Sequence, residues 1–457
     1  MSKKQLVMDH ILMEIENGKI LQGQRLPSCR KLAADLGINK ITVNKAYEEL
    51  EESHLVYSIP CGGFYLIRRH TEPFTSNAIV DFKTVRLEEN LIPYREFNHV
   101  INTSVDRHHE DLFNYECSSG YLPLRRELKK MFENDGIYAQ TEQILVTSGA
   151  QQAISLVFQA IFRNCSRKLL VEVPTYGLVL ELADRLGIPM VGIPRSKDGY
   201  DLRQLGTIFK SGDVEAFYVV PRHQNPTGFT FDESTKRHVA DLSQRYGIRI
   251  IEDDYLSDLG SKKNALPIHY YDTKKSTIYI RSFSKTFMPG IRIGAAVLPE
   301  DLANDIIQLK KLMDINTSQL PQAALQLFIQ SGMYDKHNLN IRRSYERKLR
   351  IARRIMESLA PPRLYWHVPE HGIFLWLILP PGIAASVLEE RLKQKGILIN
   401  TAADCYLDAY CASEQGSTAS DIPSRAVRLC ISGVSFDELD AIAVILREIL
   451  DMSCTSA

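Results

Sequence analysis

The sequence predicts a small α+β module at the N-terminus, followed by a larger α/β domain with a smaller α+β part at its C-terminal end. Its length of 457 residues is enough for two or three domains. Amphipathic helical segments separated by glycine turns occupy the front of the chain. From about residue 141, short β-rich apolar runs alternate with helical segments, which is typical of a mostly parallel sheet covered by helices.

The composition limits the classes to which the chain can belong. Hydrophobic residues make up 44% of the chain and charged residues 24%, as in soluble globular proteins. The 55 basic and 55 acidic residues cancel, so a nucleic acid must be bound by a local patch. No apolar run approaches the roughly 20 residues of a membrane span, and the N-terminus has no signal-peptide core. We therefore expect a cytoplasmic protein without a membrane partner.

The eight cysteines are scattered and include no Cys-x-x-Cys pair. We expect reduced thiols, and neither a disulfide framework nor a zinc site. The acidic run at 252–254 has no histidine at a ligand spacing, so no metal is expected there either.

Three helices and a hairpin are predicted at the front of the chain. The helices cover residues 5–18, 29–36 and 40–53, Gly37 forms the tight turn, and a hairpin follows over 55–67. Polar donors lie on the first turns of the third helix, as on a recognition helix that enters a major groove. The first 70 residues hold ten basic and eight acidic residues, a net charge of +2 (10 − 8). On the pattern alone, a generic three-helix interaction module remains an alternative.

Residues 26–50 resemble the winged helix-turn-helix of GntR-type bacterial transcription regulators. The resemblance implies a domain over 1–68, with the helix-turn-helix at about 28–47, that binds a double-stranded DNA operator. Polar residues 69–84 follow as the expected linker. The resemblance implies DNA contacts from four residues: Arg30, Lys40, Thr42 and Asn44.

Seven apolar runs are predicted as strands of the larger domain, and ligands of such sheets bind at the carboxyl ends of the strands. The runs cover residues 144–147, 168–173, 190–193, 216–220, 249–252, 277–280 and 295–298. Long helices are predicted over 301–360, and strands of the smaller part over 369–376 and 425–430.

A lysine that is preceded by two small hydroxyl residues follows the sixth of these runs. Lys285 lies after Ser282 and Ser284, and Arg292 comes seven residues later. Partial burial and nearby cations lower the pKa of an amine, as Schiff-base chemistry requires. Hydroxyls and a guanidinium also suit a phosphate. The alternative is a basic loop with a solvated lysine.

Other polar residues stand at other strand ends. The turn at 147–152 opens a helix and directs backbone N–H groups at an anion. Tyr176 can stack on a flat ring or belong to the core. Asn225 can donate to a phenolate oxygen or form a turn before proline. Together these groups fit pyridoxal 5'-phosphate, which has a phosphate tail, a ring nitrogen and a phenolic oxygen.

Residues from about 85 to 450 resemble the fold-type I aminotransferases, with Ser-Gly-Ala-Gln, Pro-Thr-Tyr, Asn-Pro-Thr-Gly, Asp-Asp-Tyr and Ser-Phe-Ser-Lys in the family's order. The resemblance implies a large part over about 115–310 and a small part over about 311–450 together with 85–114. It implies that Lys285 forms the Schiff base and that Asp253 holds a proton on the pyridine nitrogen. The other implied cofactor contacts are Asn225 and Tyr255 at the phenolic oxygen, Tyr176 on the ring, and Ala150, Gln151, Ser282, Ser284 and Arg292 at the phosphate.

The same resemblance implies a homodimer in which Tyr115 reaches the phosphate of the neighbouring subunit. It also implies that Arg428 grips a substrate carboxylate through a bidentate fork, whereas Arg425 is expected to be exposed. The chain departs from the family pattern at His371, where glycine is usual.

The two halves together resemble the MocR subfamily of GntR-type regulators. The resemblance implies a transcription regulator that senses pyridoxal 5'-phosphate, or an amine or amino acid effector, through aldimine chemistry at Lys285. Two alternatives remain open. One is an active aminotransferase of an amino acid that carries a DNA-binding domain, and the other is a cofactor-free domain used only to dimerise.

Overall fold

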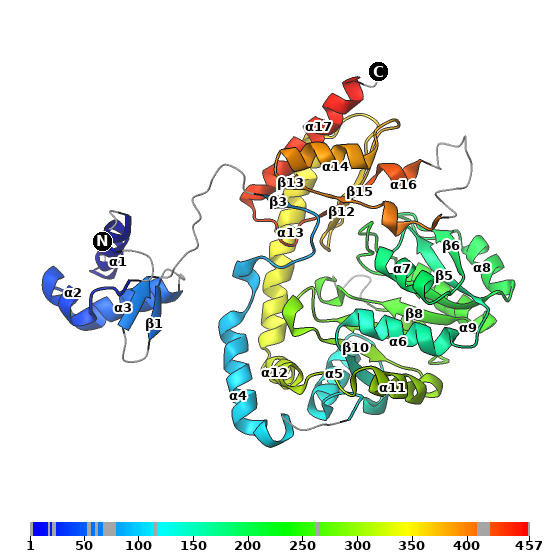
Figure 1. Cartoon of the computed structure of the whole chain (residues 1–457), viewed down its shortest axis with the longest axis horizontal. Coiled ribbons are helices and arrows are strands. Elements are labelled where there is room, and N and C mark those ends of the chain that lie inside the picture. Colours follow the sequence, from blue (N-terminus) through cyan, green and yellow to red (C-terminus); the bar gives the residue numbers. More distant parts are fainter. Residues whose placement is uncertain are drawn as a thin grey trace. The chain divides into compact units, whose positions relative to one another are not determined.

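The computed structural model describes residues 3–16, 19–20, 24–52, 56–59, 63–66, 79–112, 117–260, 266–408 and 421–455. The chain separates into two compact units, Met1–Ala78 and Ile79–Ala457 (Figure 1).

The first unit contains three helices and an antiparallel hairpin, in the order α1 (Lys3–Glu16), α2 (Cys29–Leu36), α3 (Lys40–Glu52), β1 (Val56–Ile59) and β2 (Gly63–Leu66). The hydroxyl of Ser28 caps α2 by accepting from the amide of Lys31 at 3.2 Å. Gly37 ends the same helix in the left-handed region, at a φ of 62°. The unit has its own core, which includes the buried side chains of Val43 and Tyr47 on α3.

A seven-stranded sheet forms the centre of the second unit, in the order β4-β10-β9-β8-β7-β5-β6. Only β10 runs antiparallel to its neighbours. The strands are β4 (Ile144–Thr147), β5 (Lys168–Val173), β6 (Met190–Pro194), β7 (Val214–Val219), β8 (Arg249–Asp253), β9 (Ile278–Ser282) and β10 (Gly294–Val297).

Helices cover both faces of this sheet, which explains why its strands are almost continuously apolar. One face packs against α6 (Ala150–Phe162), α7 (Gly177–Arg185) and α11 (Glu300–Asp314). The other face packs against α4 (Tyr94–Leu112), α5 (Leu122–Asn134), α8 (Leu202–Lys210), α9 (Glu233–Tyr246), α10 (Ile268–Tyr271) and α12 (Gln319–Gln330). The short 3-10 helices are η1 (Glu89–Leu91), η2 (Thr141–Gln143), η3 (Ser257–Leu259), η4 (Pro289–Ile291), η5 (Ala403–Cys405) and η6 (Asp437–Asp440).

The smaller part of this unit has a four-stranded antiparallel sheet, in the order β11-β12-β15-β14. Its elements are β11 (Tyr365–His367), β12 (Phe374–Ile378), α14 (Ala385–Gln394), β13 (Ile397–Leu398), β14 (Asn400–Thr401), α16 (Ile422–Arg425), β15 (Ala426–Cys430) and α17 (Ala441–Thr455). The long helix α13 (Met333–Leu359), yellow in Figure 1, contributes Tyr334 to a core of the larger part and Leu349 to the core of the smaller part.

The first residues of the second unit belong to the smaller part. Strand β3 (Val80–Asp81) pairs in parallel with β13, and Phe82 is fully buried in the same core. Residues 79–84, which we expected in the linker, therefore lie within the second unit. The remainder of the expected linker up to residue 78 falls outside the described residues.

Candidate functional site

A cavity of about 350 Å³ lies at the carboxyl ends of the parallel strands β4, β5, β7, β8 and β9. It brings together every cofactor-binding residue that the sequence suggested except Tyr115, which falls outside the described residues. The lining residues are Thr84, Val85, Ala150, Gln151, Ile154, Tyr176, Tyr218, Val220, Asn225, Asp253, Tyr255, Ser282, Ser284, Lys285, Arg292, Phe374 and Arg428. We call this space the cofactor cavity.

Lys285 follows β9 and is half-buried in the wall of the cofactor cavity. Burial lowers the pKa of its amine, and the positive charges of Arg292 and Arg428 lower it further, while Cys430 acts in the opposite direction. A larger share of neutral amine makes Lys285 a better nucleophile toward an aldehyde.

Asp253 is the last residue of β8 and is only 4% exposed. Its Oδ2 accepts a hydrogen bond from the hydroxyl of Tyr218 at 2.7 Å, whereas its Oδ1 is buried without a partner among the described residues. Burial and the nearby charge of Asp254 raise the pKa of Asp253 to about 7, against the opposing effect of the Tyr218 hydrogen bond. A buried acceptor in a cavity wall needs a donor, and a protonated pyridine nitrogen is one.

The N-terminus of α6 and the loop after β9 form a cradle for an anion. Gly149 precedes α6 at a φ of 89°, and a Cβ on Gly294 would lie 2.7 Å from the amide nitrogen of Ala150, so the two backbones touch. Arg292 donates from Nη2 to the carbonyl of Ser148 at 3.3 Å. The hydroxyl of Ser284 is buried without a partner among the described residues. These groups fit a phosphate, which favours helix N-termini, hydroxyls and arginine.

The groups expected at the phenolic oxygen and the ring face lie on the remaining walls. The hydroxyl of Tyr255 donates to the carbonyl of His223 at 2.7 Å, and the Oδ1 of Asn225 accepts from Nη1 of Arg428 at 2.9 Å. Tyr176 lies at the start of α7, where burial raises the pKa of its hydroxyl to about 12.

Arg428 lies on β15 and lines the cofactor cavity next to Asn225. Its Nη2 donates to the carbonyl of Lys83 at 3.1 Å, and its guanidinium carbon lies 4.7 Å from the ring centre of Phe374. It forms no ion pair with a carboxylate within the described ranges, and its Nε is buried without a partner there. A buried guanidinium of this kind fits a ligand carboxylate.

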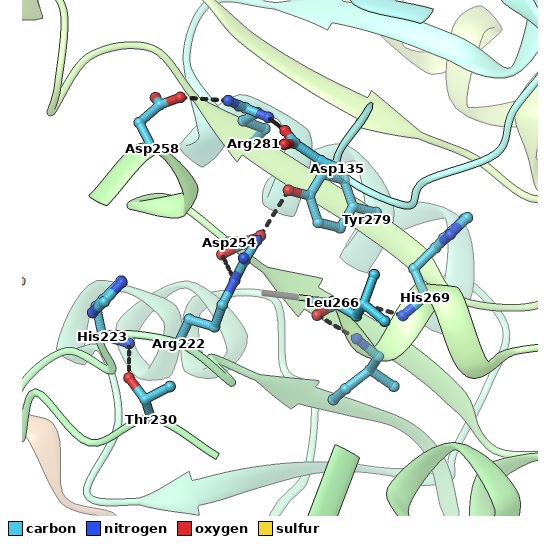
Figure 2. A network of polar contacts seen from close by, with 12 residues as sticks. Asp135, Arg222, His223, Thr230, Asp254, Asp258, Leu266, His269, Tyr279 and Arg281 are labelled. Carbon is cyan, nitrogen blue, oxygen red and sulfur yellow. Dashed lines mark hydrogen bonds and ion pairs between the residues drawn. The ribbon is translucent and has the colours of Figure 1, made fainter. Parts of the chain in front are cut away.

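A network of charged side chains joins the loops that follow β7 and β8 to strand β9 (Figure 2). Arg222 pairs with Asp254, whose Oδ2 also accepts from the hydroxyl of Tyr279 at 2.7 Å. Arg281 pairs with Asp258. Although burial alone would raise it, the charge of Arg222 holds the pKa of Asp254 below its usual value. The network keeps Asp254 ionised next to Asp253 and so contributes to the raised pKa of the latter.

A second cavity, of about 620 Å³, lies on the other side of the loop that carries Asn225. His371 lines this second cavity and is not among the residues that line the cofactor cavity. Its carbonyl lies 3.1 Å from the ring Nδ1 of His223, so His223 links this loop to the one that carries His371. The departure from the family pattern at His371 therefore does not close the cofactor cavity.

Sequence reasoning missed three features of the site. Tyr218, which orients Asp253, has a polar hydroxyl within the buried run of β7, and this was the only available signal. Thr84 ends the stretch that we expected in the linker, and Val85 begins the expected aminotransferase-like domain, and neither was expected to line the site. Arg425 was expected to be exposed, but it is buried, with 8% of its surface exposed. It donates to Asp421 at 2.7 Å and to the carbonyl of Leu379 at 2.5 Å.

The residues expected to contact DNA lie on α2 and α3 of the first unit. Arg30 and Lys40 are exposed, whereas Thr42 and Asn44 are half-buried. The Nδ2 of Asn44 donates to Glu48 at 2.7 Å, so Asn44 must give up this bond before it can reach a base edge.

Within the part of the chain that the structure describes, no group of histidine, cysteine or acidic residues can hold a metal ion. No described helix has the length and apolar character of a membrane span.

Two family models match the chain. The model "Aminotransferase class I and II" matches residues 83–446, and "Bacterial regulatory proteins, gntR family" matches residues 3–66. The uncharacterized HTH-type transcriptional regulator YcxD of Bacillus subtilis is 36% identical over 90% of this chain and 94% of its own length. The HTH-type transcriptional regulator NorG of Staphylococcus aureus is 26% identical over 82% of this chain and 91% of its own.

Solved aminotransferases share the fold of the second unit. Kynurenine aminotransferase of Pyrococcus horikoshii, solved with PMP, has a TM-score of 0.74 and 25% identity, covering 83% of this chain and 92% of that one. LysN of Thermus thermophilus, solved with a phosphopyridoxyl-leucine adduct, has a TM-score of 0.72 and 22% identity, covering 82% and 93%. The predicted fold class is confirmed. The chain thus belongs to the MocR-type family of GntR regulators, in which a gntR-family helix-turn-helix precedes a class I and II aminotransferase domain.

Proposed function

We propose that this regulator binds pyridoxal 5'-phosphate in the cofactor cavity and changes its binding to an operator when an amine or amino acid reaches that cavity. When bound, the cofactor supplies an aldehyde that condenses reversibly with amines. Lys285 supplies the competing amine of the protein, and its lowered pKa supports this role.

The observation that carries the proposal is the buried Oδ1 of Asp253. This atom has no partner within the described ranges, yet it belongs to a residue that lines the same cavity as the anion cradle. Leaving a buried acceptor unpaired costs about 1–3 kcal/mol, so the site is built for a ligand with a ring donor at one end. Asp253 would hold a proton on the ring nitrogen, and Ser284, Arg292 and the start of α6 would hold the phosphate.

The residues proposed to contact DNA lie in the first unit. Arg30 and Lys40 are exposed and can neutralise phosphates, and the half-buried Thr42 and Asn44 lie on the face of α3 that would enter the groove.

We also propose a homodimer, since two DNA-binding units would match the two half-sites of an operator. The C-terminal end of α11 supports it, because Leu312, Met313 and Ile315 are 85%, 54% and 53% exposed. Apolar side chains gathered in this way mark interaction surfaces. Tyr115 of the partner would then reach the phosphate, as the family resemblance implies.

A titration with pyridoxal 5'-phosphate tests the proposal at Lys285. Wild-type protein is expected to develop the absorbance of a lysine-bound cofactor, and an amine panel is expected to change both this absorbance and the binding of a selected DNA fragment. Lys285→Ala is expected to lose both responses and to keep its non-specific DNA affinity. Lys336→Ala, at an exposed lysine on α13, is the matched control. An amine response of DNA binding that survives in Lys285→Ala would contradict the proposal.

An aminotransferase activity is the second candidate, and one observation favours it. Lys285, Asp253 and Arg428 all line one cavity, as a transamination site needs. Single-turnover reactions with amino acid donors, followed through the cofactor's absorbance, test it. Absence of the pyridoxamine form with every donor would count against aminotransferase activity. It would not contradict the proposed regulatory function.

A further inference from the structure

The second cavity is a cleft between the larger and the smaller part of the second unit. The larger part contributes the turn after β6 and the loop after β7, and the smaller part contributes α13, β11 and the loop that leads to β12. The second cavity shares no lining residue with the cofactor cavity. Its volume of about 620 Å³ is within the range of small-molecule binding sites.

Two cations reach the second cavity, one from each part. Lys197 stands on a turn of the larger part that is closed by two hydrogen bonds between the backbones of Ser196 and Gly199, at 3.0 and 3.2 Å. Arg353 belongs to α13, and its Nη2 donates to the carbonyl of Val368 at 2.9 Å. Neither cation forms an ion pair with a carboxylate in the described part of the chain. Both are therefore available to a negatively charged ligand.

The ring of His367, on β11, lies within the influence of both cations. Burial lowers the pKa of His367 to about 4, and the positive charges of Lys197 and Arg353 lower it further. The ring is therefore neutral at pH 7, and it forms no hydrogen bond with the residues that the structure describes. A neutral imidazole keeps one N–H donor, which can bind an anion held by the two cations.

The other charges of the second cavity do not neutralise these two cations. Arg222 is paired with the buried Asp254. Glu357 and Glu370 are exposed, and neither of them forms an ion pair with a cation of this cavity. The half-buried Arg353 thus keeps its charge without a partner. A partly desolvated guanidinium binds an anion more strongly than an exposed one, since less water competes for it.

Two aromatic side chains give the second cavity an apolar wall. Phe229 follows β7, and its ring centre lies 4.9 Å from that of His367 in an edge-to-face arrangement. Trp366 lies on β11 and is half-buried. Aromatic side chains bury large apolar areas and favour offset or edge-to-face contact with a second ring. The wall therefore suits a flat apolar group.

We propose that the second cavity binds a small aromatic anion, whose negative group lies between Lys197 and Arg353 and whose ring packs against Trp366 and Phe229. Each part of the unit supplies one cation and one aromatic side chain, so the ligand holds the two parts together. The negative group is a carboxylate or a phosphate, because a guanidinium and an amine bind both.

The loop after β7 connects this site to the cofactor cavity. The amide of His223 donates to the hydroxyl of Thr230 at 3.0 Å, and both residues line the second cavity (Figure 2). The carbonyl of His223 accepts at 2.7 Å from Tyr255, which lines the cofactor cavity. An anion that restrains this loop should change cofactor affinity, and the cofactor should change anion affinity by the same factor. This consequence rests on the proposed function, whereas the binding of the anion does not.

Trp366 provides a probe of the site, because the chain has two tryptophans and the other, Trp376, is buried on β12. In full-length Trp376→Phe, the fluorescence of Trp366 is titrated with benzoate, phenyl phosphate, benzyl alcohol and inorganic phosphate. Calorimetry on the wild-type protein repeats the series. We expect benzoate or phenyl phosphate to bind roughly tenfold more tightly than benzyl alcohol and inorganic phosphate, and the tighter of the two identifies the negative group. Benzyl alcohol binding as tightly as both aromatic anions, or no binding of either anion, would overturn the proposal.

Three substitutions locate the bound anion. Lys197→Gln and Arg353→Gln each remove one cation and should weaken the binding of the aromatic anion roughly tenfold. Arg354→Gln changes an exposed neighbour on α13 that does not line the second cavity, and it should bind like the parent protein. Because Arg353 also holds the carbonyl of Val368, the exposed Lys197→Gln decides if Arg353→Gln is unstable. Unchanged affinity in Lys197→Gln would refute the site.

The connection between the two cavities has a separate test. Pyridoxal 5'-phosphate is titrated with and without a saturating concentration of the tighter anion, and the anion is titrated with and without the cofactor. We expect both affinities to change by the same factor, roughly fivefold or more, and Lys197→Gln to remove the change. An effect that persists in Lys197→Gln would indicate competition at the anion cradle and refute the connection. A protein that never binds the cofactor would refute the proposed function, while Trp366 would still report the anion.

Discussion

Asp253 is the residue whose ionisation should govern the stability of the cofactor-free protein. Its folded pKa of about 7 lies above the ordinary value of 3.8. Stability from the protonated form is therefore fully present below pH 3.8 and is lost as the pH rises through about 7. The loss is on the order of 4 kcal/mol at most, and the similarly buried Glu252 adds to it.

Asp253→Asn tests this linkage, because the amide has nearly the same shape and does not ionise. Without cofactor, the variant should gain stability relative to wild type between pH 5 and pH 8, as measured by urea unfolding. With pyridoxal 5'-phosphate the order should reverse, since the variant loses a charge-assisted hydrogen bond and binds roughly ten- to a hundredfold more weakly. If the free energy of unfolding depends on pH in the same way in both cofactor-free proteins, the pKa of Asp253 is not raised by folding.

The sequence predicted which residues line the site better than it predicted their hydrogen-bond partners. Asp253 ends β8, and Lys285 and Arg292 follow β9, so their positions in one cavity could be inferred from strand ends. The bond from Arg428 to the carbonyl of Lys83 could not, since a backbone acceptor carries no residue-type signal. The burial of Arg425 was missed for the same reason, because one of its partners is the carbonyl of Leu379.

Among the elements, the contact between β10 and the start of α6 should limit cofactor binding. A Cβ on Gly294 would lie 2.6 Å from the carbonyl carbon of Gly149, so Gly294→Ala must push the two elements apart. We expect a loss of about 1–3 kcal/mol in the free energy of unfolding and weaker cofactor binding. Gly290→Ala, which meets only open space, is the control and should stay within about 0.5 kcal/mol. Thermal unfolding and a cofactor titration measure the two effects. Similar losses of stability and cofactor affinity in Gly294→Ala and Gly290→Ala would show that this contact does not limit cofactor binding.

The helices α2 and α3 carry the prediction for DNA. Arg30→Ala and Lys40→Ala should each weaken binding to specific and non-specific DNA alike, and each should reduce the slope of log affinity against log salt by about one. Lys4→Ala removes the same charge from α1, where Lys4 pairs with Glu49, and serves as the control. Fluorescence anisotropy at several salt concentrations measures the slope. An unchanged slope would show that the substituted residue does not contact the DNA phosphates.

Element positions were predictable where turn chemistry and apolar runs agreed. The helix predicted over 29–36, with Gly37 as its turn, matches the observed bounds of α2. The antiparallel direction of β10 was not predictable, because an apolar run has the same appearance in either direction. Strand β3 has only two residues and leaves no periodic pattern, which explains why this stretch was assigned to the linker.

At the scale of the whole molecule, the exposed end of α11 should decide the state of association. Leu312→Asp places a charge in the centre of the proposed dimer surface and should weaken dimerisation by tenfold or more, about 1.4 kcal/mol. Sedimentation velocity measures the effect. Leu359→Asp, at the similarly apolar but only 44% exposed end of α13, is the control. A wild-type monomer, or a dimer insensitive to Leu312→Asp, would exclude this surface.

The pairing of β3 with β13 joins the beginning of the second unit to a strand more than three hundred residues later. During synthesis, the DNA-binding unit is therefore complete long before its anchor exists, because residues 397–398 are among the last quarter to be made. A fragment that ends before Ile397 would therefore carry the helix-turn-helix without this pairing, and under the proposed function its DNA binding would not respond to an amine.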